Sequence, residues 1–133
     1  PTAMLIRIYG KKDREPYGDI VHYHLKKPVP YQGAAELVLR IDAISRSLNL
    51  PPSESSFRSI RRPRDETRNV LPEEYWNGED NGPPPRVRDT IYLQLVGRQH
   101  TSIQGRIWGR VTKKKYITFR SALELIYLLS EAV

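Results

Sequence analysis

The sequence contains no cysteine, which excludes disulfide scaffolds, thiolate metal sites, iron–sulfur clusters and cysteine nucleophiles. Long apolar runs are also missing, since none approaches the roughly 20 residues that a membrane-spanning helix needs. No basic and then apolar leader opens the chain. We therefore expect a cytoplasmic protein with no membrane partner. Met4 is the only methionine, so we expect the natural start there, with residues 1–3 as a cloning remnant.

Glycine is scarce, with 8 residues against 11 prolines, and no P-loop or G-x-G-x-x-G pattern occurs. His22 and His24 lie two apart on an expected strand and would point the same way, but a zinc site needs further ligands. His100 and Ser102 lack a third group to orient a base, and no nucleophile elbow is present. We therefore predict no catalytic residue, no metal and no cofactor, and a protein that is not an enzyme.

The chain has 133 residues, the length of one compact domain, so we predict a single domain over residues 1–133. Alternation of apolar and polar residues predicts the strands Met4–Tyr9, Ile20–Leu25, Thr90–Val96, Ser102–Val111 and Tyr116–Phe119. The expected turns between them are Lys11–Asp19, Gly97–Thr101 and Lys113–Lys115.

Helical spacing predicts helices over Ala34–Leu48 and Ala122–Ala132. The second begins at a capping box of Ser121 and Glu124 and is apolar nearly all round, so we expect it to be buried on more than one side. The predicted fold class is α+β, a mostly antiparallel sheet of about five strands with two helices. The sheet would comprise an N-terminal hairpin and a three-stranded C-terminal meander.

Residues 49–89 hold seven of the eleven prolines and form a long excursion between these elements. An excursion of this length is either disordered or functional. Leu71, Tyr75 and Trp76 are the residues expected to attach its middle to the core, through one helical turn around Pro72–Trp76.

Charge is distributed unevenly around the net value of +7. Residues 86–120 hold nine basic side chains against Asp89 alone, a local excess of +8 in a region that reads as sheet. Such a block is a candidate footprint for an anion, and the alternative is a solvated basic face without a ligand.

Period-two alternation sends a second set of side chains to the face opposite the apolar one: Tyr92, Gln94, Gln104, Arg106, Trp108, Arg110, Tyr116 and Thr118. Three rings between arginines form a stacking surface for unpaired bases, with Arg98, Lys113, Lys114 and Lys115 widening the positive field. This predicts a small basic module that binds single-stranded RNA or DNA. Two alternatives remain open: the hairpin or first helix covers this face and makes Trp108 part of a second core, or the chain is a protein-interaction adaptor that docks through the excursion and the last helix. No oligomeric state is predicted.

Two short motifs resemble those of PilZ domains. Arg58 and Arg62 form R-x-x-x-R, and His100-Thr101-Ser102-Ile103-Gln104-Gly105 resembles (D/N)-x-S-x-x-G with His at the first position. The resemblance implies a cyclic-dinucleotide site of Arg58, Arg62, Ser102 and Gly105. From Ala34 on, the element order also resembles the double-stranded RNA-binding domain, although the basic residues here precede the third strand.

A longer resemblance covers most of the chain outside the excursion. Residues 98–105 read R-Q-H-T-S-I-Q-G, Trp108 follows, and residues 119–126 read F-R-S-A-L-E-L-I. They resemble the tail of a family of small bacterial proteins, R-Q-N-x-[ST]-W-Q-G, then W, then F-R-S-x-L-E-L-I, and residues 17–39 resemble its front half. His100 replaces the expected Asn and Ile103 the expected Trp, so a family site at these positions would be altered. The resemblance implies that the chain is one conserved unit. It does not imply a function.

Overall fold

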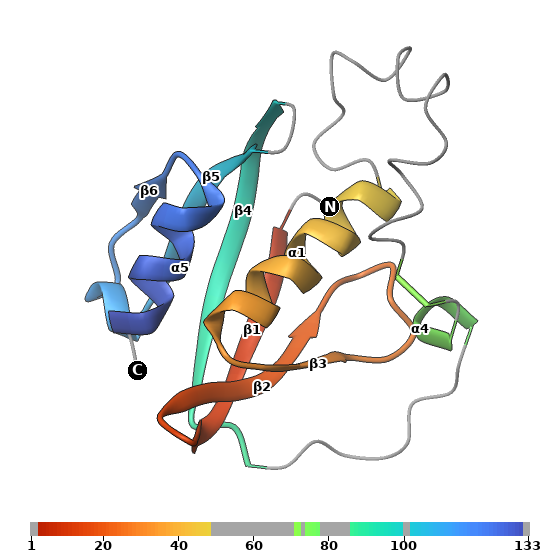
Figure 1. Cartoon of the computed structure of the whole chain (residues 1–133), viewed down its shortest axis with the longest axis horizontal. Helices are drawn as coiled ribbons and strands as arrows, with labels where there is room; N and C mark the ends of the chain where they lie inside the picture. Colours follow the sequence, from red (N-terminus) through yellow and green to blue (C-terminus); the bar gives the residue numbers. More distant parts are fainter. Residues whose placement is uncertain (1–2, 49–70, 73, 78–85, 100–101, 132–133) are drawn as a thin grey trace.

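The computed structural model describes residues 3–48, 71–72, 74–77, 86–99 and 102–131. It contains a six-stranded sheet of order β3-β2-β1-β4-β5-β6, in which all neighbouring strands are antiparallel (Figure 1). The strands are β1 (Ala3–Lys12), β2 (Glu15–Val21), β3 (Val29–Gln32), β4 (Asp89–Gln99), β5 (Ser102–Gly109) and β6 (Ile117–Phe119). The predicted α+β class is confirmed, with six strands in place of about five.

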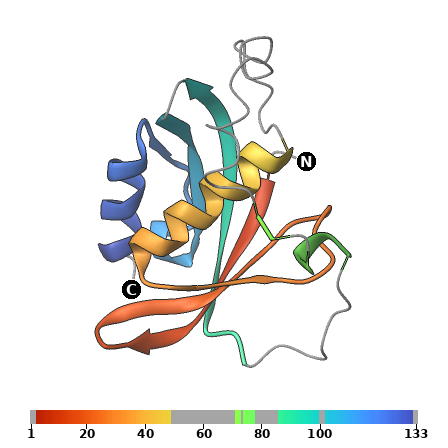
Figure 2. The ribbon, with the colours of Figure 1, turned by 45° about the vertical axis from the view of Figure 1, so that its right-hand side comes forward.

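Two helices, α1 (Ala34–Leu48) and α5 (Ala122–Glu131), pack on the same face of this sheet, as two views agree (Figures 1 and 2). Between the helices and the sheet lies the apolar core, which includes Ile6, Ile41, Leu93, Phe119 and Leu125. Pairing of β1 with β4 joins the N-terminal hairpin to the C-terminal meander in one sheet. No helix in the described ranges is both long and apolar enough to cross a membrane.

The N-terminal hairpin closes more tightly than predicted. Its turn is Asp13-Arg14 alone, and both residues have positive φ, 54° and 66°, as a type I′ turn requires. The expected turn Lys11–Asp19 was therefore wrong, because β1 and β2 continue to the two-residue turn. Asp19 consequently lies within β2.

The strand β3 was not predicted, because Pro28 and Pro30 interrupt its sequence. Pro30 lies on an edge strand, where a missing N–H is tolerated. Val29 and Tyr31 point into the core, as the alternating burial of β3 shows. After β3, Gly33 adopts φ 89° and leads into α1, whose predicted bounds are confirmed.

The C-terminal meander differs from its prediction at three places. β4 runs on through Gln99, with a bulge between Leu95 and Gly97, so the expected turn Gly97–Thr101 begins too early. β5 ends at Gly109, and the short 3-10 helix η1 (Arg110–Thr112) follows. Ile117 has the register of the core face but is 37% exposed, because β6 is the edge strand.

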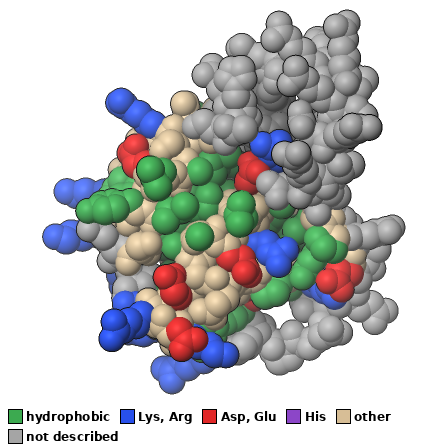
Figure 3. All heavy atoms as spheres, viewed as in Figure 1, with side chains coloured by type: hydrophobic (Ala, Val, Ile, Leu, Met, Phe, Trp, Pro, Cys, Tyr) green, Lys and Arg blue, Asp and Glu red, His purple; other side chains and the backbone are tan. Residues whose placement is uncertain are grey.

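The last helix is buried on one side only. Leu125 and Leu129 face the core, whereas Leu123 and Tyr127 are 76% and 64% exposed, so the expectation of burial on more than one side was wrong. Ser121 caps its N-terminus, since the Glu124 N–H donates to the Ser121 hydroxyl at 3.1 Å, which is the Ser121 half of the predicted capping box. Hydrophobic side chains gather over the helix side of the molecule (Figure 3).

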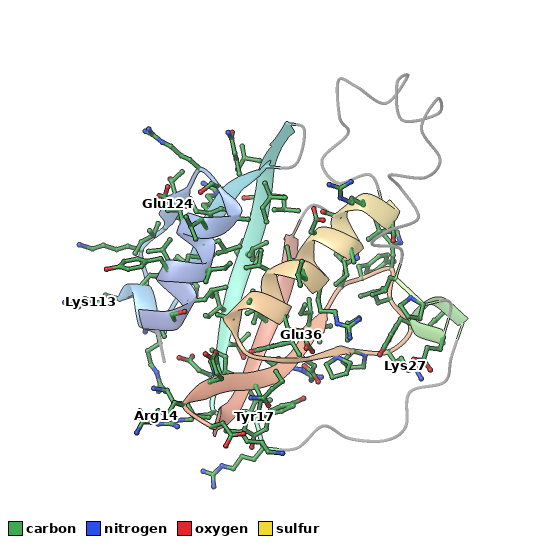
Figure 4. The ribbon with its side chains drawn as sticks, in the orientation of Figure 1. Arg14, Tyr17, Lys27, Glu36, Lys113 and Glu124 are labelled. Atoms are coloured by element: carbon green, nitrogen blue, oxygen red, sulfur yellow. The ribbon has the colours of Figure 1, made fainter. Side chains whose placement is uncertain are left out.

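Part of the excursion packs against the core as predicted. Leu71 is buried and Tyr75 is half-buried against the core cluster. Tyr75 belongs to the single-turn helix α4 (Glu74–Asn77), and its carbonyl accepts a hydrogen bond from the Lys26 N–H at 2.9 Å. Lys27 lies beside this turn, 3.7 Å from the Glu74 carboxylate (Figure 4). The Trp76 side chain lies outside the described residues.

Candidate nucleic-acid interface

The face of the sheet away from α1 and α5, here called the open face, displays the aromatic residues that the alternation predicted. Tyr92 on β4 and Trp108 on β5 are direct cross-strand partners, and Gln94 and Arg106 form the next pair on the same face. Trp108 is 37% exposed and Tyr116 is 51% exposed, while Tyr92 is half-buried. The sequence pattern therefore placed these rings correctly.

The idea that the hairpin or α1 covers this face was wrong. Strands β1 and β2 extend the sheet through the pairing of β1 with β4, so the hairpin lies beside the meander. The helix α1 buries Leu37, Ile41 and Ile44 in the core on the other face. Trp108 is absent from the core cluster, and 37% of it is exposed.

Arg106 contacts both Gln94 and Tyr116 on the open face. Its Nε donates a hydrogen bond to the Gln94 Oε1 at 2.8 Å, and its guanidinium carbon lies 4.1 Å from the centre of the Tyr116 ring. The Tyr116 ring in turn meets the Tyr92 ring edge-on, with centroids 6.5 Å apart. We call Tyr92, Gln94, Arg106, Trp108 and Tyr116 the ring cluster.

A hydrogen-bonded turn places three lysines next to this cluster in the sequence. The Thr112 hydroxyl accepts from the Gly109 N–H at 3.0 Å and donates to the Gly109 carbonyl at 2.9 Å, which closes η1. Lys113 and Lys114 then adopt φ 56° and 60°, and Lys115 completes the turn before Tyr116. All three lysines are exposed, and Lys113 projects outward from the β6 side of the molecule (Figure 4).

Arg110 was predicted on a strand and lies in η1 instead. β5 ends at Gly109, two residues earlier than predicted, because the Thr112 hydroxyl holds the backbone of Gly109 in the turn. Arg110 is exposed beside the lysine turn, so it contributes to the positive charge there without sharing the strand register of Arg106. Gln104 and Thr118 are exposed, and both have the register of the open face.

Sequence reasoning missed a second polar group on the open face. Asp19 on β2 faces Arg7 on β1 and accepts from its Nε at 2.6 Å and its Nη2 at 2.8 Å. The Tyr9 hydroxyl also donates to Asp19. The group was missed because Asp19 was assigned to a turn, although Arg7 and Tyr9 occupy the outward positions of the predicted first strand.

The two tyrosines near Asp19 are held in their neutral form. Burial, the hydrogen bond to Asp19 and the charge of Asp19 raise the pKa of Tyr9 to about 12. Burial, followed by the charge of Asp19, also raises the pKa of Tyr31 above its usual value of 10.0. The Tyr31 hydroxyl donates to the Arg7 carbonyl at 3.0 Å. This hydrogen bond links β3 to β1 across β2.

Several predicted site residues remain untested. Arg58 and Arg62 lie outside the described residues, and so do the side chains of Arg98 and Ser102. Gly105 lies in β5, where an added Cβ would stand 2.2 Å from the Gln94 carbonyl oxygen. Close packing explains this glycine, and the PilZ-like site stays a prediction.

The two histidines that could suggest a metal site do not lie on a strand, since β2 ends at Val21. His22 is buried, and its Nδ1 accepts a hydrogen bond from the His24 backbone N–H at 3.1 Å. Across the part of the chain that the structure covers, no three His, Asp or Glu side chains gather as metal ligands would.

Comparison with known proteins adds no relative. No family model, no curated protein sequence and no solved structure matches this chain. The resemblance to the family of small bacterial proteins therefore stays a prediction, and the functional argument depends on the geometry of the open face.

Proposed function

We propose that this chain is a non-enzymatic module that binds single-stranded RNA or DNA through the open face of β4, β5 and β6. The observation that supports this most is the ring cluster itself. Tyr92, Trp108 and Tyr116 gather with Arg106 on a sheet face that neither long helix covers. The lysine turn at residues 113–115 stands at its edge.

The chemistry of this cluster suits unpaired bases better than a duplex. Every base has a π-face, and stacking on an aromatic side chain contributes about 1–3 kcal/mol per base. Arg106 is planar and always charged, so it can stack on a base or contact a phosphate. The lysines interact with phosphates as point charges, which makes the affinity depend on salt.

Fluorescence anisotropy of labelled single-stranded RNA and DNA, at low and moderate salt, tests the proposal. We expect binding that weakens steeply with salt, and a loss of about tenfold or more in the Trp108→Ala variant. Tyr127→Ala is the matched control, because this ring is 64% exposed on α5 in the helix layer. It should bind as the parent protein does.

Thermal unfolding of both variants separates a binding defect from a folding defect. A Trp108→Ala protein that folds normally and binds normally contradicts the proposal, as does absence of binding at low salt. Displacement of the labelled strand by a cyclic dinucleotide would instead favour the PilZ-like site of Arg58, Arg62, Ser102 and Gly105.

A second candidate function is a protein-interaction adaptor. It is favoured by the outward side of α5, where Leu123 and Tyr127 expose 76% and 64% of their surface one helical turn apart. A partner bound through this surface should be captured in a salt-insensitive manner, without nucleic acid. A Leu123→Gln/Tyr127→Ala variant should lose it while Trp108→Ala retains it.

A further inference from the structure

The ring cluster is one end of a longer apolar row that crosses the sheet. Direct cross-strand pairs join Val21 on β2 to Leu5 on β1, Leu5 to Tyr92 on β4, and Tyr92 to Trp108 on β5. Ile117 of β6 pairs with Ile107 of β5. Tyr116, the residue before Ile117, therefore lies next to Trp108 and continues the same line. We call Val21, Leu5, Tyr92, Trp108 and Tyr116 the cross-sheet row.

The row is accessible along its length. Leu5 is 41% exposed, Val21 and Tyr92 are half-buried, and Trp108 and Tyr116 are exposed. Leu5 takes an outward position of β1, whereas Met4, Ile6 and Ile8 alternate with it and are buried in the core. Leu5 therefore adds an exposed aliphatic side chain to the open face, directly beside Tyr92.

Charge is distributed unequally along the row. At the β5–β6 end, Arg106 lies on one side of the row and the lysine turn on the other, and these side chains are exposed. At the β1–β2 end the neighbouring cation is Arg7, whose guanidinium is bound by both oxygens of Asp19. The first end is therefore positive, and the second is apolar with a compensated ion pair beside it.

We propose that a bound single strand crosses the sheet along this row, at right angles to the β-strands, and that Leu5 and Val21 form a further base subsite. The inference rests on the proposed function and extends its site to the N-terminal hairpin. Phosphates gather at the positive β5–β6 end. A base at the other end of the bound segment rests on the aliphatic side chains of Leu5 and Val21.

The proposal sets the size of the site. A four-stranded sheet with aromatic residues stacks two or three bases in known modules. This row spans four strands and continues to Tyr116, the residue before β6, so it accepts about four bases. Tyr116, Trp108 and Tyr92 each take one base, and Leu5 with Val21 takes the fourth. A site confined to the ring cluster would accept about three.

A length series of unlabelled oligonucleotides, competing with a labelled longer strand, tests this assignment. We expect affinity to rise with each nucleotide up to about four and to change little beyond that. The Leu5→Gln variant should bind a tetranucleotide about fivefold more weakly and a dinucleotide as well as the parent protein does. Leu5→Phe, which offers a ring at the same position, should bind the tetranucleotide at least as tightly as the parent.

Leu39→Gln is the matched control, since Leu39 is 58% exposed on α1 in the opposite layer and should not affect binding. If affinity stops rising at two or three nucleotides, or if Leu5→Gln and Leu5→Phe both bind the tetranucleotide as the parent does, the subsite is wrong while the ring cluster stands. If no oligonucleotide of any length binds, the proposed function itself is wrong.

Discussion

The guanidinium of Arg106 lies over the Tyr116 ring with its central carbon 4.1 Å from the ring centre, and its Nε donates to Gln94 Oε1 at 2.8 Å. Two contacts thus fix a cation on an exposed sheet face, between a ring and an amide. A group held in this way loses little conformational entropy when it meets a ligand, because its rotamer is already selected.

Variants of Arg106 test whether nucleic-acid binding depends on the planar guanidinium group or only on its positive charge. Arg106→Lys keeps the charge and loses the planar stack, so we expect weaker binding with an unchanged salt slope. Arg106→Gln removes the charge, and the slope of log affinity against log salt should fall by about 1. Anisotropy titrations at several salt concentrations measure both quantities. Equal affinity of the parent and both variants would place the ligand away from the ring cluster.

A substitution at Gly105 tests the close packing of β5 against its neighbours β4 and β6. A Cβ there would stand 2.2 Å from the Gln94 carbonyl oxygen and 2.9 Å from the Phe119 ring. We expect Gly105→Ala to lower the free energy of unfolding by about 3 kcal/mol, measured by urea denaturation.

Gly10→Ala is the control for that substitution, because its added Cβ would lie 3.4 Å from the Tyr17 ring, an ordinary contact. Its stability should remain within about 0.5 kcal/mol of the parent. A Gly105→Ala protein as stable as Gly10→Ala would contradict the register of β4 with β5.

Tyr9 makes stability depend on pH in the alkaline range. Its pKa is raised from 10.0 to about 12 in the folded protein, so the contribution of its neutral phenol is complete below pH 10.0 and is lost as the pH rises toward 12. The free energy of unfolding should fall with pH across this window, and less steeply in Tyr9→Phe. Phenolate absorbance of the folded protein should lose a late-titrating step in the same variant. An unchanged absorbance titration would show that Tyr9 is not the group that ionises late.

Much of the fold was predictable because its longer elements have regular patterns. The bounds of α1 follow from apolar residues such as Leu37, Ile41 and Ile44 at helical spacing. The placement of Trp108 on the open face follows from its alternation with Ile107 and Gly109.

The differences come from contacts between distant residues. Nothing local in Asp13-Arg14 indicates a type I′ turn, which usually contains Asn-Gly or Asp-Gly. β3 has four residues, one of them proline, and is held by its pairing with β2. The outward exposure of Leu123 and Tyr127 depends on α5 lying at the surface of a two-layer fold, which helical periodicity alone does not specify.

The sequence predicted the aromatic residues of the candidate site but not the residues that extend it onto β1 and β2. Tyr92, Arg106 and Trp108 alternate on clear strands, so sequence reasoning could place them together. Leu5 and Asp19 join the same face only because β1 pairs with β4 and because the first hairpin has a two-residue turn. Pairing between strands far apart in sequence has no signal in a single chain.

Intrinsic fluorescence tests the central claim most directly, because the chain has two tryptophans and one of them is Trp108. In a Trp76→Phe protein, all tryptophan emission comes from Trp108. Titration with an unlabelled single strand at low salt should quench this emission, and the curve should saturate at the concentration at which anisotropy saturates. Emission that stays unchanged while anisotropy reports binding, or absence of binding by both readouts, would contradict base stacking on Trp108.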